Sequence, residues 1–174
     1  MIEVLVSIAI LAFGLLGLAA FQLRSQAAEF ESFQRAQALE LLRDMASRMQ
    51  ANRANAAGYV GTALGTGVAD CTGTVGTVAF DRCEWNAMLK GSSEQTGSSK
   101  VGAMVGARGC ITQVQAPVTT AGGCLPGIYE ISVAWQGLVA TVAPSNTCGS
   151  GSYGDDALRR LVSTRVAVAP LTCS

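Results

Sequence analysis

The chain has 174 residues, of which 49% are hydrophobic and 14% are charged, and its 12 Lys and Arg residues balance its 12 Asp and Glu residues. A neutral chain has no overall attraction for polyanions, which excludes a basic nucleic-acid-binding protein, so we do not expect nucleic acid as a partner. Because histidine is absent, Ser-His-Asp and Cys-His sites and His-ligated metals are excluded, and we expect no enzyme activity, no metal and no cofactor.

The first 21 residues, MIEVLVSIAILAFGLLGLAAF, contain a single charge, Glu3. As a helix this segment spans about 31 Å, close to the thickness of the hydrocarbon core of a bilayer. No Lys or Arg precedes the apolar run, so a cleavable signal peptide is the weaker alternative. No later apolar run is as long, and we therefore expect one N-terminal membrane anchor.

Three residues of this segment are candidates for function. An ionised carboxylate among apolar residues costs a few kcal/mol, so Glu3 is expected to pair with a protonated amine. The alternative is that Glu3 only interacts with the positive end of the helix dipole. Gly14 and Gly17 weaken the helix and let a neighbouring helix approach closely, although glycines are also common in membrane helices.

Residues 22–53 contain no Pro or Gly and predict a continuation of the helix. Asp44 and Arg48 form an acid-before-base pair four residues apart, which supports a helix. Apolar residues recur at helical spacing and predict one buried stripe: Phe30, Phe33, Leu41, Leu42, Met45, Ala46 and Met49. A helix over residues 1–53 is about 80 Å long, so we expect its first half among other apolar helices and its amphipathic second half on the chain's own head.

The remaining residues, 54–174, predict a Gly-rich globular head. Gly and Thr dominate residues 58–77, which predict a loop, and the glycines of residues 61–67 lack the Gly-Lys-Ser/Thr of a phosphate-binding loop. Residues 81–91 predict a short helix that Asp81 caps and that buries Trp85, Met88 and Leu89. The Ser- and Gly-containing residues 91–99 predict an exposed connection.

Three later segments alternate polar and apolar residues and predict strands at 109–117, 127–137 and 159–170, with 138–144 as a possible fourth. We expect an antiparallel sheet whose apolar face the amphipathic helix covers. Two further features are interpreted as surface structure. Asp155 and Asp156 predict a turn rather than a calcium site, and the strand arginines predict solvated charges: Arg159, Arg160 and Arg165.

All six cysteines follow the apolar segment, and none forms a C-x-x-C motif. An even number of cysteines behind a membrane anchor predicts disulfides in an oxidising compartment, the periplasm or the cell exterior. The alternative is reduced cysteines in the core of a cytosolic domain. Many pairings are possible, and we favour the sequential one because each bridge closes a local loop: Cys71–Cys83, Cys110–Cys124 and Cys148–Cys173.

The segment IEVLVSIAILAFGLLGLAAFQLRSQAA resembles the N-terminus of type IV pilins, and FESFQRAQALELLRDMASRMQANRA resembles the PilV-type minor pilins in particular. The resemblance is most specific over residues 2–57. GIYEISVAWQG and the arginine-bearing strand before Cys173 also resemble the head of that family, whereas residues 58–108 contribute little.

The resemblance implies an α+β lollipop fold, with a long N-terminal helix at 1–53 (membrane span and filament core at 1–21, amphipathic part at 22–53) and a small antiparallel head at 54–174. It implies that Glu3 pairs with the N-terminal amine of a neighbouring subunit. The implied partners are the major pilin, other minor pilins, the assembly platform in the inner membrane and, where a leader is present, the prepilin peptidase. The implied location is the inner membrane with the head in the periplasm, and later the pilus at the cell surface.

Members of that family begin with an N-methylated Phe after a basic leader is removed, whereas here Met1 directly precedes Ile2 and Glu3. The absence of a proline near Ala20 resembles minor rather than major pilins. The expected function is therefore that of a minor pilin in pilus priming or tip formation. The alternatives are a minor pseudopilin of a type II secretion system, and an adhesin or DNA-uptake pilin whose head binds a surface or nucleic acid.

Overall fold

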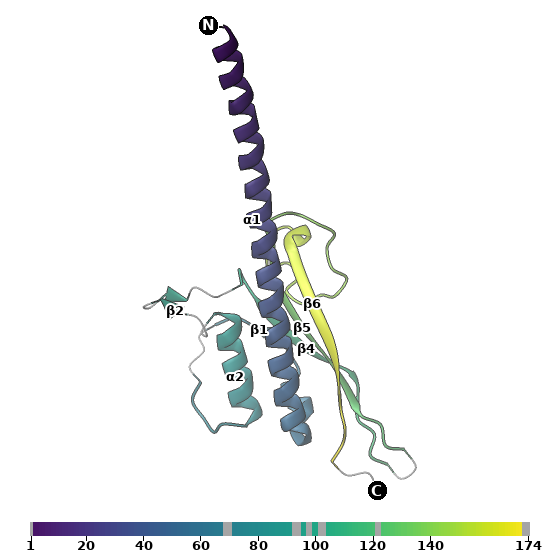
Figure 1. The fold of residues 1–174 in the computed structure, drawn as a ribbon. Coiled ribbons are helices and arrows are strands. Elements are labelled where there is room, and N and C mark those ends of the chain that lie inside the picture. Colours follow the sequence, from purple (N-terminus) through teal and green to yellow (C-terminus); the bar gives the residue numbers. More distant parts are fainter. Residues whose placement is uncertain are drawn as a thin grey trace. The chain divides into compact units, whose positions relative to one another are not determined.

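The computed structural model of the chain describes residues 2–67, 71–91, 95–96, 99–100, 104–120 and 123–171. Contacts divide the chain into two compact units, Met1–Gln34 and Arg35–Ser174, which we call the N-terminal and the C-terminal unit. The elements follow in the order α1 (Ile2–Ala51), η1 (Arg53–Tyr59), β1 (Gly61–Leu64), α2 (Val78–Leu89), β2 (Gln95–Thr96), β3 (Ser99–Lys100), β4 (Arg108–Gln115), β5 (Gly127–Gln136), η2 (Asp156–Leu158) and β6 (Arg159–Val168) (Figure 1).

The long N-terminal helix is confirmed, because α1 is continuous from Ile2 to Ala51. Its residues in the C-terminal unit present one face to the core, formed by Ala38, Leu42, Met45 and Met49. The sequence predicts Phe30 and Phe33 in this buried stripe, and that prediction is wrong. About half of the surface of each residue is exposed. Helical spacing alone therefore gave the correct face but set its beginning too early.

The four-stranded sheet has the order β1-β4-β5-β6, and all neighbouring strands are antiparallel. This confirms the expected α+β fold. Strands β5 and β6 lie within their predicted segments, and β4 begins one residue before its segment. The fourth strand is β1, at Gly61–Leu64, where a loop was expected. The segment 138–144 forms no strand; Thr141 N–H instead donates a hydrogen bond to Ala157 O at 2.8 Å. A four-residue strand carries too little alternation to be seen in sequence, and β1 forms because β4 supplies its backbone partners.

The main core lies between the sheet and two helices of the C-terminal unit. Trp85 and Leu89 of α2 are buried there together with the α1 stripe, as the spacing in α2 predicts. Trp85 lies so close to β4 that a Cβ atom at Gly109 would be 2.2 Å from its ring. The sheet contributes the residues on its inner face, among them Ile111, Tyr129, Ile131, Val133, Trp135, Val166 and Val168.

The N-terminus of α2 corrects the predicted cap. Thr77 is the N-cap, and its Oγ1 accepts a hydrogen bond from Phe80 N at 3.3 Å. Asp81 lies inside the first turn and is buried, because it binds side chains of other elements. The predicted connection at 91–99 lies mostly outside the described residues.

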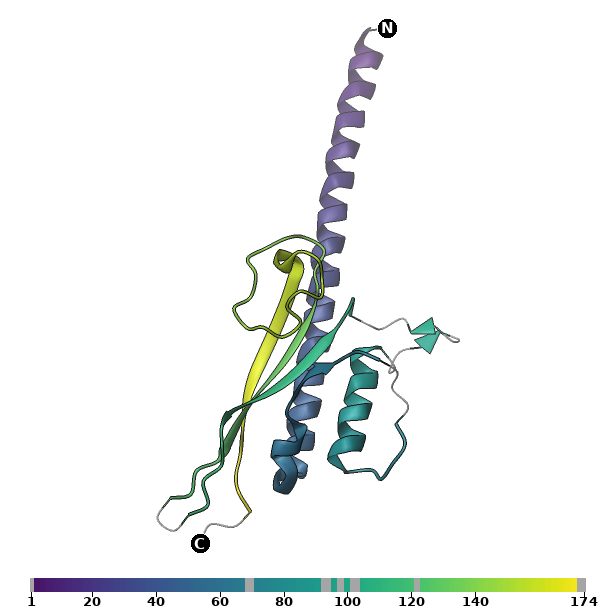
Figure 2. The same ribbon diagram turned by 180° about the vertical axis from the view of Figure 1, so that it is seen from behind.

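A second layer covers part of the outer face of the sheet. The loop between β5 and β6 passes over this face, on the side away from the end of α1 (Figures 1 and 2). A small cluster of Cys110, Ala134, Cys148 and Tyr153 fills the space between the loop and the strands, with Leu161 packed against it.

Candidate functional site

The N-terminal part of α1 is the first candidate site. Every residue from Ile2 to Gln26 is exposed, including a long series of Ile, Leu, Val and Phe side chains. Within the described residues, α1 is the one helix that is long and apolar enough to cross a membrane, and none of its most apolar 18-residue window is buried. Its backbone groups are satisfied within the helix, as a membrane span requires.

Glu3, Gly14 and Gly17 lie on one side of this helix. At about 100° per residue, their positions fall within roughly 60° of one another around the axis. Ser7 lies on the same side, and its Oγ donates a hydrogen bond to the carbonyl oxygen of Glu3 at 2.8 Å. Among the described residues, no atom lies within 4 Å of a Cβ built at either glycine, so nothing in this part of the chain requires glycine there. This side of the helix combines small residues with one carboxylate.

A cluster around Arg48 joins α1 to α2. The Nε atom of Arg48 donates to Asp44 at 2.8 Å, and Nη1 donates to Glu84 at 2.6 Å and to Asp81 at 3.2 Å. Burial opposes the charge of Arg48, but the hydrogen bonds that Arg48 donates to Glu84 and Asp44 outweigh it and raise the pKa of the guanidinium. The predicted Asp44–Arg48 pair is thus confirmed, and it extends to two carboxylates of another helix.

Tyr59 completes this cluster. Its hydroxyl group donates to Asp81 and accepts from Asn52 Nδ2, the latter at 3.3 Å. Burial, followed by the hydrogen bond to Asp81, raises the pKa of Tyr59 to about 12. The cluster therefore fixes η1 and α2 on the end of α1, and each of its side chains has a partner within the fold.

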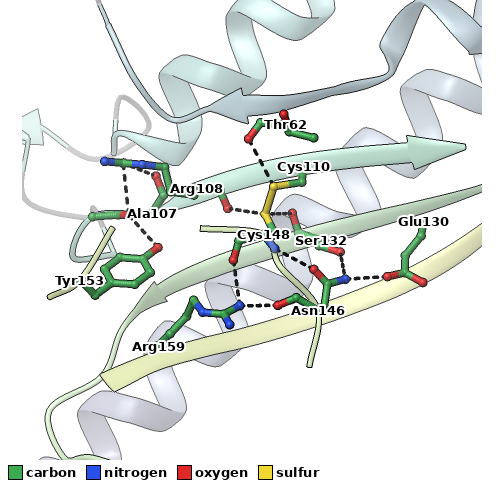
Figure 3. Close-up of a disulfide and its surroundings, with 11 residues drawn as sticks. Thr62, Ala107, Arg108, Cys110, Glu130, Ser132, Asn146, Cys148, Tyr153 and Arg159 are labelled. Carbon is green, nitrogen blue, oxygen red and sulfur yellow. Dashed lines mark hydrogen bonds between the residues drawn. A yellow bond between two sulfur atoms is a disulfide. The ribbon is translucent and has the colours of Figure 1, made fainter. Parts of the chain in front are cut away.

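A second polar cluster, around Arg159, holds the β5–β6 loop on the sheet (Figure 3). The Arg159 side chain is 2% exposed and makes a bidentate pair with Asp156, at 2.9 Å through Nε and 2.7 Å through Nη2. Hydrogen bonds from Arg159 lower the pKa of the Asp156 carboxyl. The guanidinium also donates to three loop carbonyl groups: those of Pro144 at 2.9 Å, Cys148 at 3.0 Å and Asn146.

The prediction of solvated strand arginines is therefore wrong for Arg159. It fits Arg165, whose side chain is 67% exposed and forms an ion pair with Glu130 at 3.2 Å. The two residues lie on the same strand, and the difference arises because the loop folds back over Arg159 and the neighbouring Arg160 but does not bind Arg165. One feature of the sequence indicates the ion pair of Arg159, namely that Asp156 precedes it by three residues.

Asn146 and Tyr153 attach the rest of the loop. Asn146 Nδ2 donates to Glu130 at 2.6 Å and to Ser132 Oγ at 3.0 Å, while its Oδ1 accepts from Cys148 N at 2.9 Å. Tyr153 Oη donates to Gly106 O at 3.0 Å, and burial raises the pKa of this tyrosine to about 12. The sequence carries no local sign of this role for either residue, because their partners are distant in the chain.

The disulfides correct the sequential pairing in part. The predicted Cys71–Cys83 disulfide is confirmed, with 5.5 Å between the Cα atoms. Cys110, however, is bonded to Cys148, with 5.8 Å between the Cα atoms, which replaces the two other sequential bridges. Cys124 is also disulfide-bonded, and Cys173 lies outside the described residues. The folding of the loop onto β4 brings Cys148 to Cys110, a proximity that sequence distance does not show.

Two motifs considered for ligand binding have structural partners instead. In the glycine-rich segment 61–67, Gly65 N donates to Asn86 Oδ1 at 2.6 Å. Asp155 caps η2, where its Oδ1 accepts from Ala157 N at 2.9 Å.

Comparison with known proteins gives one family. Residues 20–90 are similar to a family model described as Tt1218-like, type IV pilin Tt1218. The match includes the larger part of α1 and continues through η1, β1 and α2. Comparisons with the curated proteins and with the solved structures gave no match. The family match supports a type IV pilin, and the one apolar helix of the described residues is consistent with membrane anchoring.

Proposed function

We propose that this protein is a minor pilin of the type IV pilus, of the PilV-like kind, which takes part in priming the filament or in forming its tip. The observation that carries the proposal is the exposed apolar part of α1, in which a single carboxylate, that of Glu3, lies on the same side as Gly14 and Gly17.

The apolar segment explains both locations of such a subunit. A bilayer accepts this surface before assembly, and after extraction other apolar helices have to cover it, because exposure to water is unfavourable. Gly14 and Gly17 let a neighbouring helix approach closely on the side where Glu3 lies. A protonated amine of that neighbour would satisfy the carboxylate, and the pair would set the register of the added subunit.

The disulfides support the proposed cellular route. Disulfides persist in oxidising compartments, so the C-terminal unit belongs in the periplasm while α1 is held in the inner membrane. The partners in this proposal are the assembly platform, the major pilin and other minor pilins, with a prepilin peptidase where a leader is present. The unbroken course of α1, which contains no proline, supports a minor rather than a major pilin.

The test is quantitative mass spectrometry of sheared surface filaments, relative to the most abundant pilin, from cells with the wild-type chain or Glu3→Ala. Glu29→Ala is the matched control, because it removes an exposed carboxylate from the same helix outside the apolar run. Immunoblots of the membrane fraction measure the pool that is available for assembly. We expect trace amounts of the wild type and of Glu29→Ala in filaments, and loss of Glu3→Ala with an unchanged membrane pool.

Other outcomes identify the alternatives. Equal recovery of Glu3→Ala would exclude the ion pair as the basis of assembly. Absence of the wild-type chain from filaments, together with a secretion defect but normal pili in a deletion strain, would favour a type II secretion pseudopilin. Normal pilus number with reduced surface or DNA binding would favour an adhesin or DNA-uptake pilin, and the salt dependence of DNA binding would separate these two.

A further inference from the structure

The sheet has two edge strands, and they differ in how they are protected. β1 has four residues and an irregular register against β4. Arg82 lies over it, since a Cβ atom at Gly61 would be 2.5 Å from Arg82 Nη2. Short strands, irregular pairing and charged side chains all prevent pairing with foreign strands. This edge is therefore closed.

β6 is neither short nor irregularly paired, and Arg165 is its one charged side chain between Leu161 and Val168. It pairs with β5 at ten consecutive positions without a bulge. The loop covers only its beginning, where Arg160 Nη2 donates to Val139 O at 2.6 Å. From Leu161 to Val168 there is no Pro, Gly or Lys, and in the described part of the chain no loop or side chain hydrogen-bonds the backbone on the open side. About half of the N–H and C=O groups of an antiparallel strand point away from its one partner.

We infer that Leu161–Val168 pairs, in the assembled structure, with an extended segment of a neighbouring pilin subunit that is not a copy of this chain. Such strand addition satisfies the free backbone groups of an open edge, and pockets for alternate side chains then select the partner. The inference rests on the proposed function, because it assumes that the C-terminal unit lies beside other pilin heads.

The charges of β6 specify the chemistry of that segment. The strand contains three arginines and no acidic residue. Arg159 is held by Asp156, but Arg165 contacts Glu130 through Nε alone in its ion pair, at 3.2 Å. Its two terminal amino groups are thus positioned to bind a second carboxylate. We expect the partner segment to carry an Asp or Glu opposite Arg165. On the face of the sheet where Val166 and Val168 lie, we expect it to carry apolar residues.

Strand direction excludes antiparallel pairing of β6 with β6 of a second copy. The end of α1 and β6 run in the same direction in the C-terminal unit (Figure 1). Pairing of β6 with β6 of another copy about a twofold axis is antiparallel and would turn the two α1 helices in opposite directions. Subunits that enter one filament from one membrane share a single direction. The pairing strand must therefore come from an element other than β6. The other edge strand of this sheet, β1, is short and irregularly paired and is closed to pairing, so we assign the pairing strand to a different subunit.

The test is site-specific photo-crosslinking in piliated cells with the full chain. A photoreactive amino acid replaces Ala167, which is exposed on β6, or Thr112, which is exposed on the inner strand β4 as the control. We expect adducts from position 167 to exceed those from position 112 about tenfold, and the crosslinked peptide to come from an acidic, extended segment of another pilin. Equal yields, or adducts between two copies of this chain, would overturn the inference.

Proline substitution tests whether the backbone makes the contact. In Ser163→Pro and Thr164→Pro, the lost N–H points to β5 in one variant and to the open edge in the other. The variant that keeps the wild-type melting temperature identifies the open-edge N–H. In that variant we expect the adducts from position 167 to fall about tenfold. Unchanged adducts in a variant that is stably folded would overturn strand pairing.

Membrane and filament fractions are analysed separately, so the inference and the proposed function fail in different ways. If the chain reaches filaments and position 167 gives no excess of adducts, only the edge inference fails. If the chain is absent from filaments and position 167 still captures another pilin-like subunit in the membrane, the edge inference stands and the pilus assignment fails. No adducts combined with absence from filaments would overturn both.

Discussion

Two arginines on one strand show how residue type alone leaves a role undecided. Arg159 and Arg165 both read as charged positions of an amphipathic strand, yet one is buried under the β5–β6 loop and the other is exposed. The buried guanidinium uses its planar fork of donors to bind one carboxylate and three loop carbonyl groups. These hydrogen bonds from Arg159 hold together a loop that has little regular secondary structure.

The first prediction compares these two residues. Arg159→Leu leaves loop carbonyl groups and a carboxylate without their donor, and we expect it to lower the free energy of unfolding by about 3–5 kcal/mol. Arg165→Leu removes an exposed ion pair and should cost about 0–1 kcal/mol. Urea unfolding of the full chain in detergent, followed by tryptophan fluorescence, measures both. Equal losses for the two variants would contradict the role given to Arg159.

Between elements, long-range bridges decide how the loop is placed. The two disulfides differ in the length of chain they close, with a sequence separation of 12 for Cys71 and Cys83 and of 38 for Cys110 and Cys148. The shorter bridge holds the N-terminal part of the loop before α2 to that helix. The longer one ties the β5–β6 loop to β4, beside the Arg159 cluster.

The second prediction follows from these lengths. A bridge that closes a longer loop removes more entropy from the unfolded chain. On this basis, replacing Cys110 and Cys148 together by Ala should cost about 4 kcal/mol, and replacing Cys71 and Cys83 about 3 kcal/mol. Denaturant unfolding of the two double variants measures the difference. A larger loss from the Cys71–Cys83 pair would show that native packing, rather than loop length, dominates.

At the level of the whole molecule, the core belongs to the C-terminal unit. The first buried apolar residue of the chain is Ala38, and all members of the main core follow it. The N-terminal unit, by contrast, consists of one helix with exposed apolar residues. The core that stabilises the fold and the apolar surface that would suit a membrane therefore lie in different parts of the sequence.

The third prediction uses this separation. A chain of residues 35–174 keeps every apolar core residue, so we expect cooperative unfolding with a melting temperature within about 4 °C of the full chain in detergent. It should no longer float with lipid vesicles. A chain of residues 52–174 is the control, because it lacks Ala38, Leu42, Met45 and Met49 and should unfold without cooperativity. Loss of the cooperative transition in the 35–174 chain would assign stability to the first 34 residues.

Features with a local cause could be predicted from sequence. The apolar segment, the continuous helix and the three long strands follow from composition and from periods of 3.6 and 2 residues, which neighbouring residues encode. Glu3, Gly14 and Gly17 were candidates for the same reason, and their roles in assembly stay predictions, because they depend on partners outside the chain.

The tertiary structure alone decided the features that join distant residues. Strand β1 forms only because β4 pairs with it. Asp81 does not cap α2 but accepts hydrogen bonds from Tyr59 and Arg48. Cys110 selects Cys148 over the nearer Cys124 because the loop is folded onto the sheet. Such contacts depend on which surfaces meet when the chain folds. They are selected by the free energy of burial and of strand pairing, which the spacing of neighbouring residues in the sequence does not encode.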